Sequence, residues 1–169
     1  VLGMNQRNHA YIMRYNRRSD YPDVDDKLRT KQLAIRYGVA TAELIGSIEY
    51  QYQVRHFLDL VANAPDFVIK PGHGSGGRGI LVITHHDGGV FHKPNGEVCD
   101  YDFIYEHISN ILSGLYSLGG QVDYALFERC IDFSDVYSRF SFQGVPDVRL
   151  IVFKGYPVMS MIRLATKES

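Results

Sequence analysis

A glycine-rich loop between two short apolar strands constrains this chain more than any other segment. Val68 and Ile69 lead into Lys70 and Pro71, and five glycines then lie between positions 72 and 79. Glycine has no side chain to hold the backbone away from a ligand, and a lysine beside the loop supplies a mobile positive charge. The pattern predicts a phosphate-binding loop. The alternative is an ordinary glycine-rich turn with a surface lysine.

The setting of the loop excludes three common phosphate-binding motifs. A dinucleotide-binding fingerprint needs a helix directly after its glycines, whereas the β-branched run from Ile80 to Thr84 predicts a strand. A Walker loop needs a lysine where Ile80 stands. A protein-kinase loop has its lysine on the strand after the glycines, whereas Lys70 precedes them. The sequence therefore predicts a glycine flap between two strands, with its lysine on the first strand.

Apolar spacing and turn residues divide the rest of the chain into helices and hairpins. Asp25-Asp26 predicts the N-cap of a helix that ends before Gly38, and an apolar stripe from Ile104 to Leu118 predicts a longer helix ended by Gly119-Gly120. Further expected elements are helices over 8–16 and 54–61, a hairpin with an Asn-Gly turn at 95–96, a strand or linker over 125–131, and a last hairpin of strands 147–153 and 158–165.

The last hairpin carries two arginines, and the length of its turn determines whether their side chains lie on the same face. A three-residue loop over 155–157 pairs Lys154 with Val158, and it therefore pairs Arg149 with Arg163 on one face. A loop of two or four residues would place the two arginines on opposite faces. We expect the three-residue loop.

Composition indicates a globular protein and excludes two classes of partner. Hydrophobic residues make up 45% of the 169 residues and charged residues 22%, and the net charge is −1. No basic field therefore draws the chain to nucleic acid, no apolar run approaches membrane-spanning length, and no signal peptide is visible. Cys99 and Cys130 form neither a zinc motif nor a disulfide framework. A reduced, cytoplasmic compartment is the expectation.

The order of four motifs resembles the ATP-grasp superfamily. These motifs are the Lys70 loop, Asp26-Lys27-Leu28-Arg29-Thr30-Lys31, Leu126-Phe127-Glu128-Arg129-Cys130-Ile131, and the arginine hairpin. The chain is most similar to the RimK-related α-L-glutamate ligase-like group, also called sugar-transfer-associated ATP-grasp proteins, over nearly its whole length. The resemblance implies an α+β ATP-grasp fold, in which two α+β lobes with antiparallel sheets grip ATP. The expected segments are a helical region at 1–65, the glycine-flap lobe at 66–124 and an incomplete second lobe at 125–169.

The resemblance also implies a reaction. It indicates an ATP-dependent carboxylate–amine ligase that forms an acyl phosphate and then an amide, with glutamate as the suggested substrate. The expected partners are ATP with Mg²⁺, and a carboxylate and an amine carried by small molecules or peptides. Two alternatives stay open: a small-molecule kinase on the same scaffold, and a non-catalytic nucleotide-binding module.

Site residues follow from the same resemblance. Lys70 and Lys27 would meet the α- and β-phosphates, although Lys31, one helical turn further on, could replace Lys27. The flap residues Gly74, Ser75, Gly76, Gly77, Arg78 and Gly79 would close over the triphosphate.

The linker and the last hairpin would complete the nucleotide site. Glu128 would accept a hydrogen bond from the adenine amine, while main-chain groups of Arg129 and Cys130 would meet the ring edge. Asp135 or Asp132 would bind the ribose, or simply cap a loop. Arg149 and Arg163 would act on the γ-phosphate or acyl phosphate; the alternative is two exposed strand arginines.

Metal ligands are not expected within these residues. His73, His85, His86 and His92 lack metal-site spacing. The chain begins at Val1 and ends at Ser169, so we expect a truncated C-terminal part, with the Mg²⁺ ligands beyond residue 169. As such a fragment, the chain is expected to bind nucleotide weakly and to be inactive in ligation.

Overall fold

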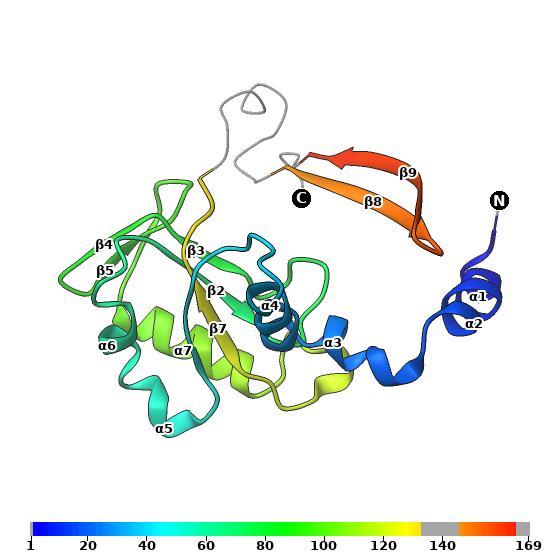
Figure 1. Ribbon diagram of the computed structural model, residues 1–169. Helices are drawn as coiled ribbons and strands as arrows, with labels where there is room; N and C mark the ends of the chain where they lie inside the picture. The colour runs from blue at the N-terminus through cyan, green and yellow to red at the C-terminus, as the bar shows by residue number, and fades with distance from the viewer. Residues whose placement is uncertain (1, 133–145, 165–169) are drawn as a thin grey trace. The chain divides into compact units, whose positions relative to one another are not determined.

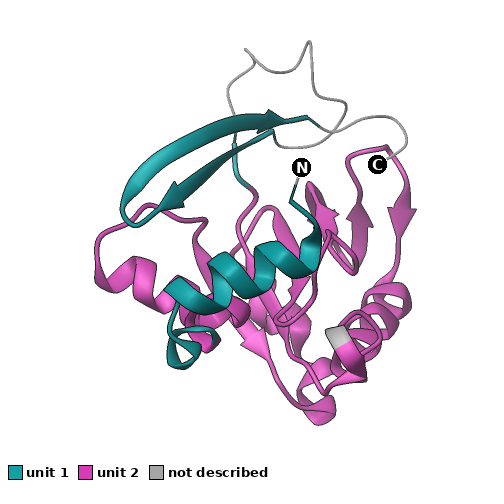
Figure 2. Cartoon of the chain, turned by 90° about the vertical axis from the view of Figure 1, so that its right-hand side faces the viewer, with its two compact units in different colours: residues 1–21, 131–169 teal, residues 22–130 magenta. Residues whose placement is uncertain are grey.

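The computed structural model describes residues 2–132 and 146–164, which form two compact units. One unit contains residues 22–130, and the other combines 1–21 with 131–169 (Figure 2). The three segments expected from the sequence remain a prediction, because the lobes of a binding site need not coincide with compact units. The mixed helix and strand content with antiparallel sheets agrees with the expected α+β class. Among the described residues, no helix is both long and apolar enough to cross a membrane.

The larger unit is built on a four-stranded antiparallel sheet in the order β1-β7-β2-β3 (Figure 1). Its strands are β1 Leu44–Ile48, β7 Ala125–Glu128, β2 Phe67–Pro71 and β3 Leu81–Ile83. In the two central strands Val68 lies opposite Glu128 and Lys70 opposite Leu126. Since side chains alternate between the faces of a sheet, Lys70 and Glu128 share one face. The residues that alternate with them along each strand point to the other face.

That other face is the hydrophobic core. Phe67, Ile69 and Phe127 are fully buried there. Helix α7 Tyr101–Leu112 packs on this face through buried isoleucines four and three residues apart, Ile104, Ile108 and Ile111. The shorter helices α5 Gln51–Val54 and α6 Phe57–Val61 add Val54, Phe57 and Val61 to the same cluster. The apolar spacing of the sequence thus predicts the buried face of α7 correctly.

Helix α7 ends earlier than predicted. Gly114 adopts φ 82°, its N–H donates to the Ile111 carbonyl at 2.9 Å, and the Leu115 N–H donates to the Asn110 carbonyl at 3.2 Å. This pair of bonds is a Schellman cap. Leu115 continues the apolar period but lies beyond the cap and is exposed, so the expected end at Gly119-Gly120 is wrong. Gly119 instead lies in a short 3₁₀ turn, η3 Leu118–Gly120.

A second sheet of three short strands lies in the same unit. Its strands are β4 His85–Asp87, β5 Val90–His92 and β6 Val98–Cys99, in that order. The β5–β6 hairpin agrees with the prediction from Asn-Gly, whereas β4 was not predicted. Gly88 and Gly89, with φ 57° and 87°, form the tight turn that joins β4 to β5.

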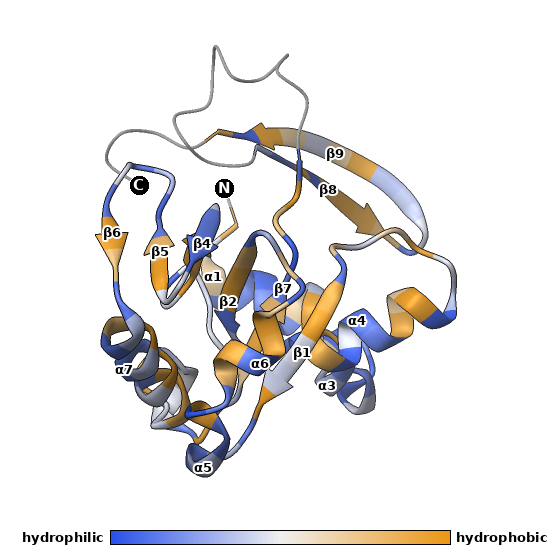
Figure 3. Ribbon diagram, turned by 90° about the vertical axis from the view of Figure 1, so that its left-hand side faces the viewer, coloured by the Kyte–Doolittle hydropathy of each residue, from blue (hydrophilic) through white to orange (hydrophobic). Residues whose placement is uncertain are grey.

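Helix α4 Lys27–Arg36 supplies lysines to the polar face of the sheet. The Asp26 carboxylate accepts a hydrogen bond from the Arg29 N–H at 3.0 Å, so the predicted N-cap is confirmed. A short turn, α3 Pro22–Asp25, precedes it. In Figure 3 the sheet lies between α7 and α4, so α4 is on the side away from the apolar core.

The smaller unit contains an N-terminal helical segment and a two-stranded hairpin. The helical segment consists of α1 Met4–Arg7, η1 Asn8–Ile12, α2 Met13–Tyr15 and η2 Arg18–Asp20, and the hairpin of β8 Asp147–Phe153 and β9 Tyr156–Arg163. The rings of Tyr11 and Tyr15 meet Phe153 edge-on at 6.0 and 5.0 Å.

The hairpin turn differs from the expected one. Lys154 and Gly155, both with positive φ, form a two-residue turn, which suits the twist of a hairpin. Arg149 pairs with Met161 and Arg163 with Asp147, so the predicted three-residue loop and the direct arginine pair are wrong. A shift in register between Ile151 and Val152 offsets the shorter turn. Arg149 and Arg163 therefore still share one face of the hairpin, but they are not direct partners, because Arg163 lies two residues beyond the residue opposite Arg149.

Candidate functional site

The polar face of the sheet carries a carboxylate held between two lysines. Glu128 is 5% exposed. Its Oε1 lies 2.6 Å from Lys31 Nζ, and its Oε2 lies 2.5 Å from Lys70 Nζ. Burial raises the pKa of Glu128, but hydrogen bonds from the two ammonium groups outweigh burial and hold that pKa below its usual value. Glu128 is therefore an ionised bridge between α4 and β2.

The two lysines differ in how many N–H donors they have left for a ligand. Lys31 is buried and also donates to the Thr41 hydroxyl at 2.8 Å and to the Ala42 carbonyl, so its three N–H groups are all used. Lys70 is 26% exposed, and Glu128 is its one partner within the described residues. Since an ammonium has three donors, Lys70 retains two for a ligand.

Lys27 holds the start of the glycine loop. Its Nζ donates to the carbonyls of Pro71 at 2.9 Å, Gly72 at 3.2 Å and Gly74 at 2.6 Å. Burial lowers the pKa of Lys27, the Asp123 carboxylate opposes this, and the charge of Lys70 adds to the lowering. All three N–H groups of this ammonium donate to carbonyls of the loop. The predicted contact of Lys27 with phosphate therefore stays a prediction.

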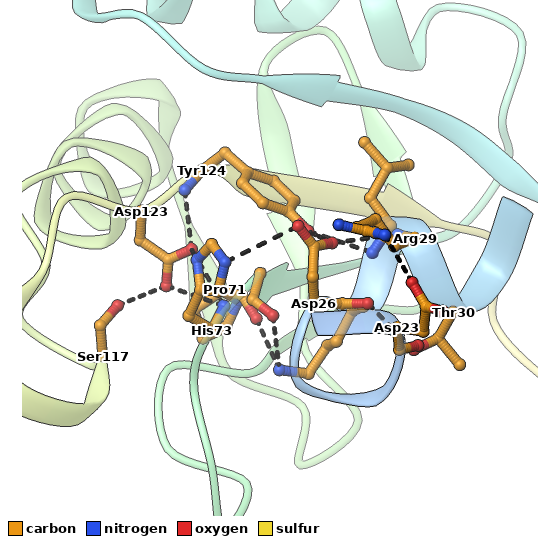
Figure 4. Close-up of polar contacts among 12 residues, drawn as sticks. Asp23, Asp26, Arg29, Thr30, Pro71, His73, Ser117, Asp123 and Tyr124 are labelled. Carbon is orange, nitrogen blue, oxygen red and sulfur yellow. Dashed lines mark hydrogen bonds and ion pairs between the residues drawn. The ribbon is translucent and has the colours of Figure 1, made fainter. Parts of the chain in front are cut away.

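Tyr124 joins the loop to the beginning of α4 (Figure 4). Its carbonyl accepts from the Gly72 N–H at 2.9 Å, and its hydroxyl donates to Asp26 Oδ1 at 2.6 Å and accepts from the Leu28 N–H at 3.0 Å. A Cβ on Gly72 would lie 2.2 Å from the Tyr124 ring, so only glycine fits this approach. Burial and the bond to Asp26 raise the pKa of Tyr124.

A buried carboxylate, Asp123, lies beside this junction. It accepts hydrogen bonds from the backbone N–H groups of His73 at 3.0 Å and Tyr124 at 2.8 Å, from His73 Nδ1 at 2.9 Å, and from the Ser117 hydroxyl. Figure 4 shows Asp123 between Ser117 and His73. Sequence reasoning missed Asp123, Tyr124 and Ser117, because about fifty positions separate them from the loop they hold and no local pattern marks them.

The far end of the loop is anchored on the α7 side. The Gly79 carbonyl lies 3.1 Å from His107 Nε2, and a Cβ on Gly79, where φ is 75°, would lie 2.5 Å from the Tyr116 ring. Between the anchors, Ser75 to Arg78 are exposed. Within the described part of the chain, the backbone N–H groups of Gly76 and Gly77 have no hydrogen-bond partner. The tip of the loop therefore presents open donors.

His107 is expected to make stability depend on pH. Burial lowers its pKa from the ordinary 6.5, and the bond to the Gly79 carbonyl only partly opposes this. Because the unfolded chain then binds the proton more readily, the stability contribution is present above about pH 6.5 and is lost as pH falls through the lowered value. The free energy of unfolding can be measured with urea for wild type and His107→Gln between roughly pH 7 and pH 5. It should fall less steeply with decreasing pH in the variant. His85→Gln, at an exposed position, should retain the wild-type slope; equal slopes for wild type and His107→Gln would contradict the prediction.

The linker after β7 is held by Asp66. The Arg129 guanidinium lies 3.0 Å from Asp66 Oδ2, and the Cys130 N–H donates to Asp66 Oδ1 at 2.9 Å. The Arg129 N–H donates to the Glu43 carbonyl at 2.9 Å. Burial and Asp66 raise the pKa of the Cys130 thiol to about 11. The main-chain donors of Arg129 and Cys130 are thus engaged, so adenine contact through them stays a prediction.

The remaining predicted residues belong to the smaller unit or lie outside the described residues. Asp132 is exposed, and Asp135 lies outside the described residues. In the smaller unit Arg149 is exposed, and Arg163 Nε donates to both Asp147 oxygens, at 2.8 and 2.9 Å. Across residues 2–132 and 146–164, no three His, Cys, Asp or Glu side chains form a metal-binding cluster.

Comparison with known protein families gives a match over nearly the whole chain. A family model described as sugar-transfer associated ATP-grasp covers residues 6–169. Proteins with ATP-grasp domains use ATP, generally for ligase-type reactions. No curated protein and no solved structure matches the chain. The family match confirms the resemblance inferred from the motif order, and it covers nearly every residue that builds the Lys70–Glu128 face and the glycine loop. The chain belongs to the sugar-transfer associated ATP-grasp family.

Proposed function

We propose that this chain binds ATP on the polar face of its sheet and serves an ATP-dependent carboxylate–amine ligase. The observation that carries the proposal is Lys70, which keeps two open N–H donors directly before a loop whose tip presents the unpartnered backbone N–H groups of Gly76 and Gly77. Ammonium and backbone N–H groups are the donors that bind phosphate oxygens best. The triphosphate would lie between Lys70 and residues 74–79.

Glu128 has two roles in this proposal. It positions Lys70, because its carboxylate binds that ammonium at 2.5 Å. Each carboxylate oxygen also keeps a further acceptor site, so Glu128 can accept a hydrogen bond from the adenine amine without releasing a lysine. Lys27 would reach a phosphate only by releasing loop carbonyls, and Lys31 only by releasing Thr41 or Ala42.

The chemistry would proceed in two displacements. A substrate carboxylate attacks the γ-phosphate of ATP and gives an acyl phosphate and ADP. An amine then attacks the acyl carbon, and phosphate leaves as the amide forms. The chain's own residues contribute positioning and neutralisation of charge, which carry most of the catalysis in phosphoryl transfer.

The two hairpin arginines would act at the reacting end of ATP. Arg149 and Arg163 share one face of the β8–β9 hairpin, and Arg163 would exchange its Asp147 partner for the γ-phosphate or the acyl phosphate. Glutamate is the substrate suggested by the family resemblance.

An ADP-release assay tests this reaction. The protein is supplied with ATP, Mg²⁺, glutamate and primary amines, and a carboxylate–amine ligase would release ADP only when both a carboxylate and an amine are present. ADP formed with a hydroxyl acceptor and no amine would show a kinase instead. Saturable ATP binding without ADP under any combination would show a nucleotide-binding module.

A further inference from the structure

The carboxylate of Asp123 is fully buried and bound mainly to one residue of the glycine loop. Its side chain is 0% exposed, and three of its hydrogen bonds come from His73: the backbone N–H reaches both oxygens, at 3.0 and 3.1 Å, and Nδ1 lies at 2.9 Å. Tyr124 N–H and the Ser117 hydroxyl complete its partners. Burying a charge is unfavourable unless donors surround it. Asp123 is therefore committed to holding His73.

The ring of His73 consequently has one orientation. An ionised carboxylate can only accept hydrogen bonds, so Nδ1 carries the proton that faces Asp123. The ring also meets Tyr124 edge-on at 5.5 Å and 81°. On either side of His73, the carbonyls of Gly72 and Gly74 are held by Lys27 Nζ. Backbone and ring are both fixed, and Nε2 is the nitrogen left for other contacts.

His73 Nε2 has no hydrogen bond within the described residues. Its nearest carboxylate oxygen is Asp26 Oδ2 at 3.7 Å, which is beyond hydrogen-bond distance. The side chain is 38% exposed. It lies three positions after Lys70 and directly before the loop residues proposed to cover the triphosphate. An imidazole held at one nitrogen by a buried carboxylate is a common way to present the other nitrogen to a substrate.

We propose that His73 is a phosphate-contacting residue of the nucleotide site, and that Asp123 is the residue that positions it. In the bound state the protonated Nε2 donates to a phosphate oxygen. This inference rests on the proposed binding of ATP at the loop. It adds to that proposal a side chain that the sequence motifs do not assign, together with its partner fifty positions away.

The test separates the Nε2 contact from the structural role of the ring. His73→Asn keeps a side-chain N–H near the position of Nδ1, where it can still bond to Asp123, and removes Nε2. His85→Asn, on exposed β4, is the matched control. Titration calorimetry measures the Kd of ATP and of adenosine for each protein. A charge-assisted hydrogen bond of this kind corresponds to a change of about tenfold or more.

The expected result is a loss that depends on phosphate. His73→Asn should weaken ATP binding about tenfold and leave adenosine binding within about twofold. His85→Asn should change neither. Asp123→Asn, which releases the ring, should also weaken ATP more than adenosine. In wild-type protein, the ¹⁵N signal of His73 Nε2 should shift on addition of ATP but not of adenosine, a readout that does not depend on any variant folding.

Other outcomes overturn the inference in distinguishable ways. If His73→Asn binds ATP as wild type does while Lys70→Met binds it poorly, His73 is not a phosphate ligand and the proposed ATP site stands. Equal losses for ATP and adenosine, or an unmoved Nε2 signal on ATP binding, would show a purely structural histidine. If the wild-type protein binds neither ligand, the proposed function itself is wrong.

Discussion

Replacing Lys70 by methionine is expected to weaken ATP binding about a hundredfold. Methionine fills a similar volume on β2 but removes the two N–H donors that Lys70 keeps open beside the loop. Hydrogen bonds to charged groups contribute about 1.5–3 kcal/mol each, so losing two at the lower end of this range corresponds to about a hundredfold. Calorimetric titration of both proteins with ATP measures it.

The matched control for Lys70 is Lys93→Met. Lys93 follows β5 in the other sheet, where its ammonium pairs with Glu97 at 3.3 Å and lies 4.3 Å from the centre of the Phe103 ring. This variant should bind ATP like wild type. Unchanged ATP affinity in Lys70→Met would remove the basis of the proposed site, because the open donors of Lys70 are the observation on which the site is proposed.

Replacing Glu128 by glutamine should lower the free energy of unfolding by about 3 kcal/mol. Glu128 is the ionic partner of Lys31, which is 6% exposed. The amide keeps the shape of the carboxylate but is neutral, so the buried ammonium of Lys31 loses its counter-charge and keeps only uncharged partners such as Thr41 and Ala42. Removing one partner of a buried ion pair is costly because the other charge remains buried and unpaired.

Urea unfolding at neutral pH measures the effect of Glu128→Gln. Glu106→Gln, at an exposed position on α7, should change stability by less than about 0.5 kcal/mol. A double variant with Lys31→Met should recover part of the loss, because it removes the unpaired charge. If Glu128→Gln alone is as stable as wild type, the ion pair does not hold α4 to the sheet.

Local sequence signals correctly predicted the elements whose ends or buried faces are determined by residues close in the sequence. The Asp26 cap fixed the start of α4, and the isoleucine spacing from Ile104 to Ile111 fixed the buried face of α7. Lys70 was placed correctly at the end of a strand before the loop. These signals operate within one or two helical turns, so a single sequence is sufficient to read them.

Turns with competing signals were predicted less well. Leu115 and Leu118 continued the apolar period of α7, and this outweighed Gly114, whose positive φ ends the helix. In the last hairpin, Pro157 suggested a loop position. It instead lies in β9 opposite Val152, next to the shift in register, where a missing N–H is tolerated.

The site shows what a sequence cannot predict without its fold. Lys70 and Glu128 were each expected near ATP, and the structure brings them together, but as partners of one another and of Lys31. Lys27 was expected at a phosphate, which stays a prediction, and in the structure its ammonium binds three carbonyls. Asp123 and Tyr124 were not predicted at all, since their contacts with the loop depend on the pairing of β2 with β7.

The two anchors of the glycine loop limit how it can respond to a nucleotide. Gly74 is tied to Lys27 and forms a bridge with Ser117, and Gly79 is held by His107 against Tyr116. Only the four residues from Ser75 to Arg78 lie between these points. A segment of this length spans at most about 3.5 Å per residue, so it cannot swing as a long lid. Its response to ligand is therefore confined to local changes in the backbone of these four residues, which makes engagement of a phosphate a short-range event.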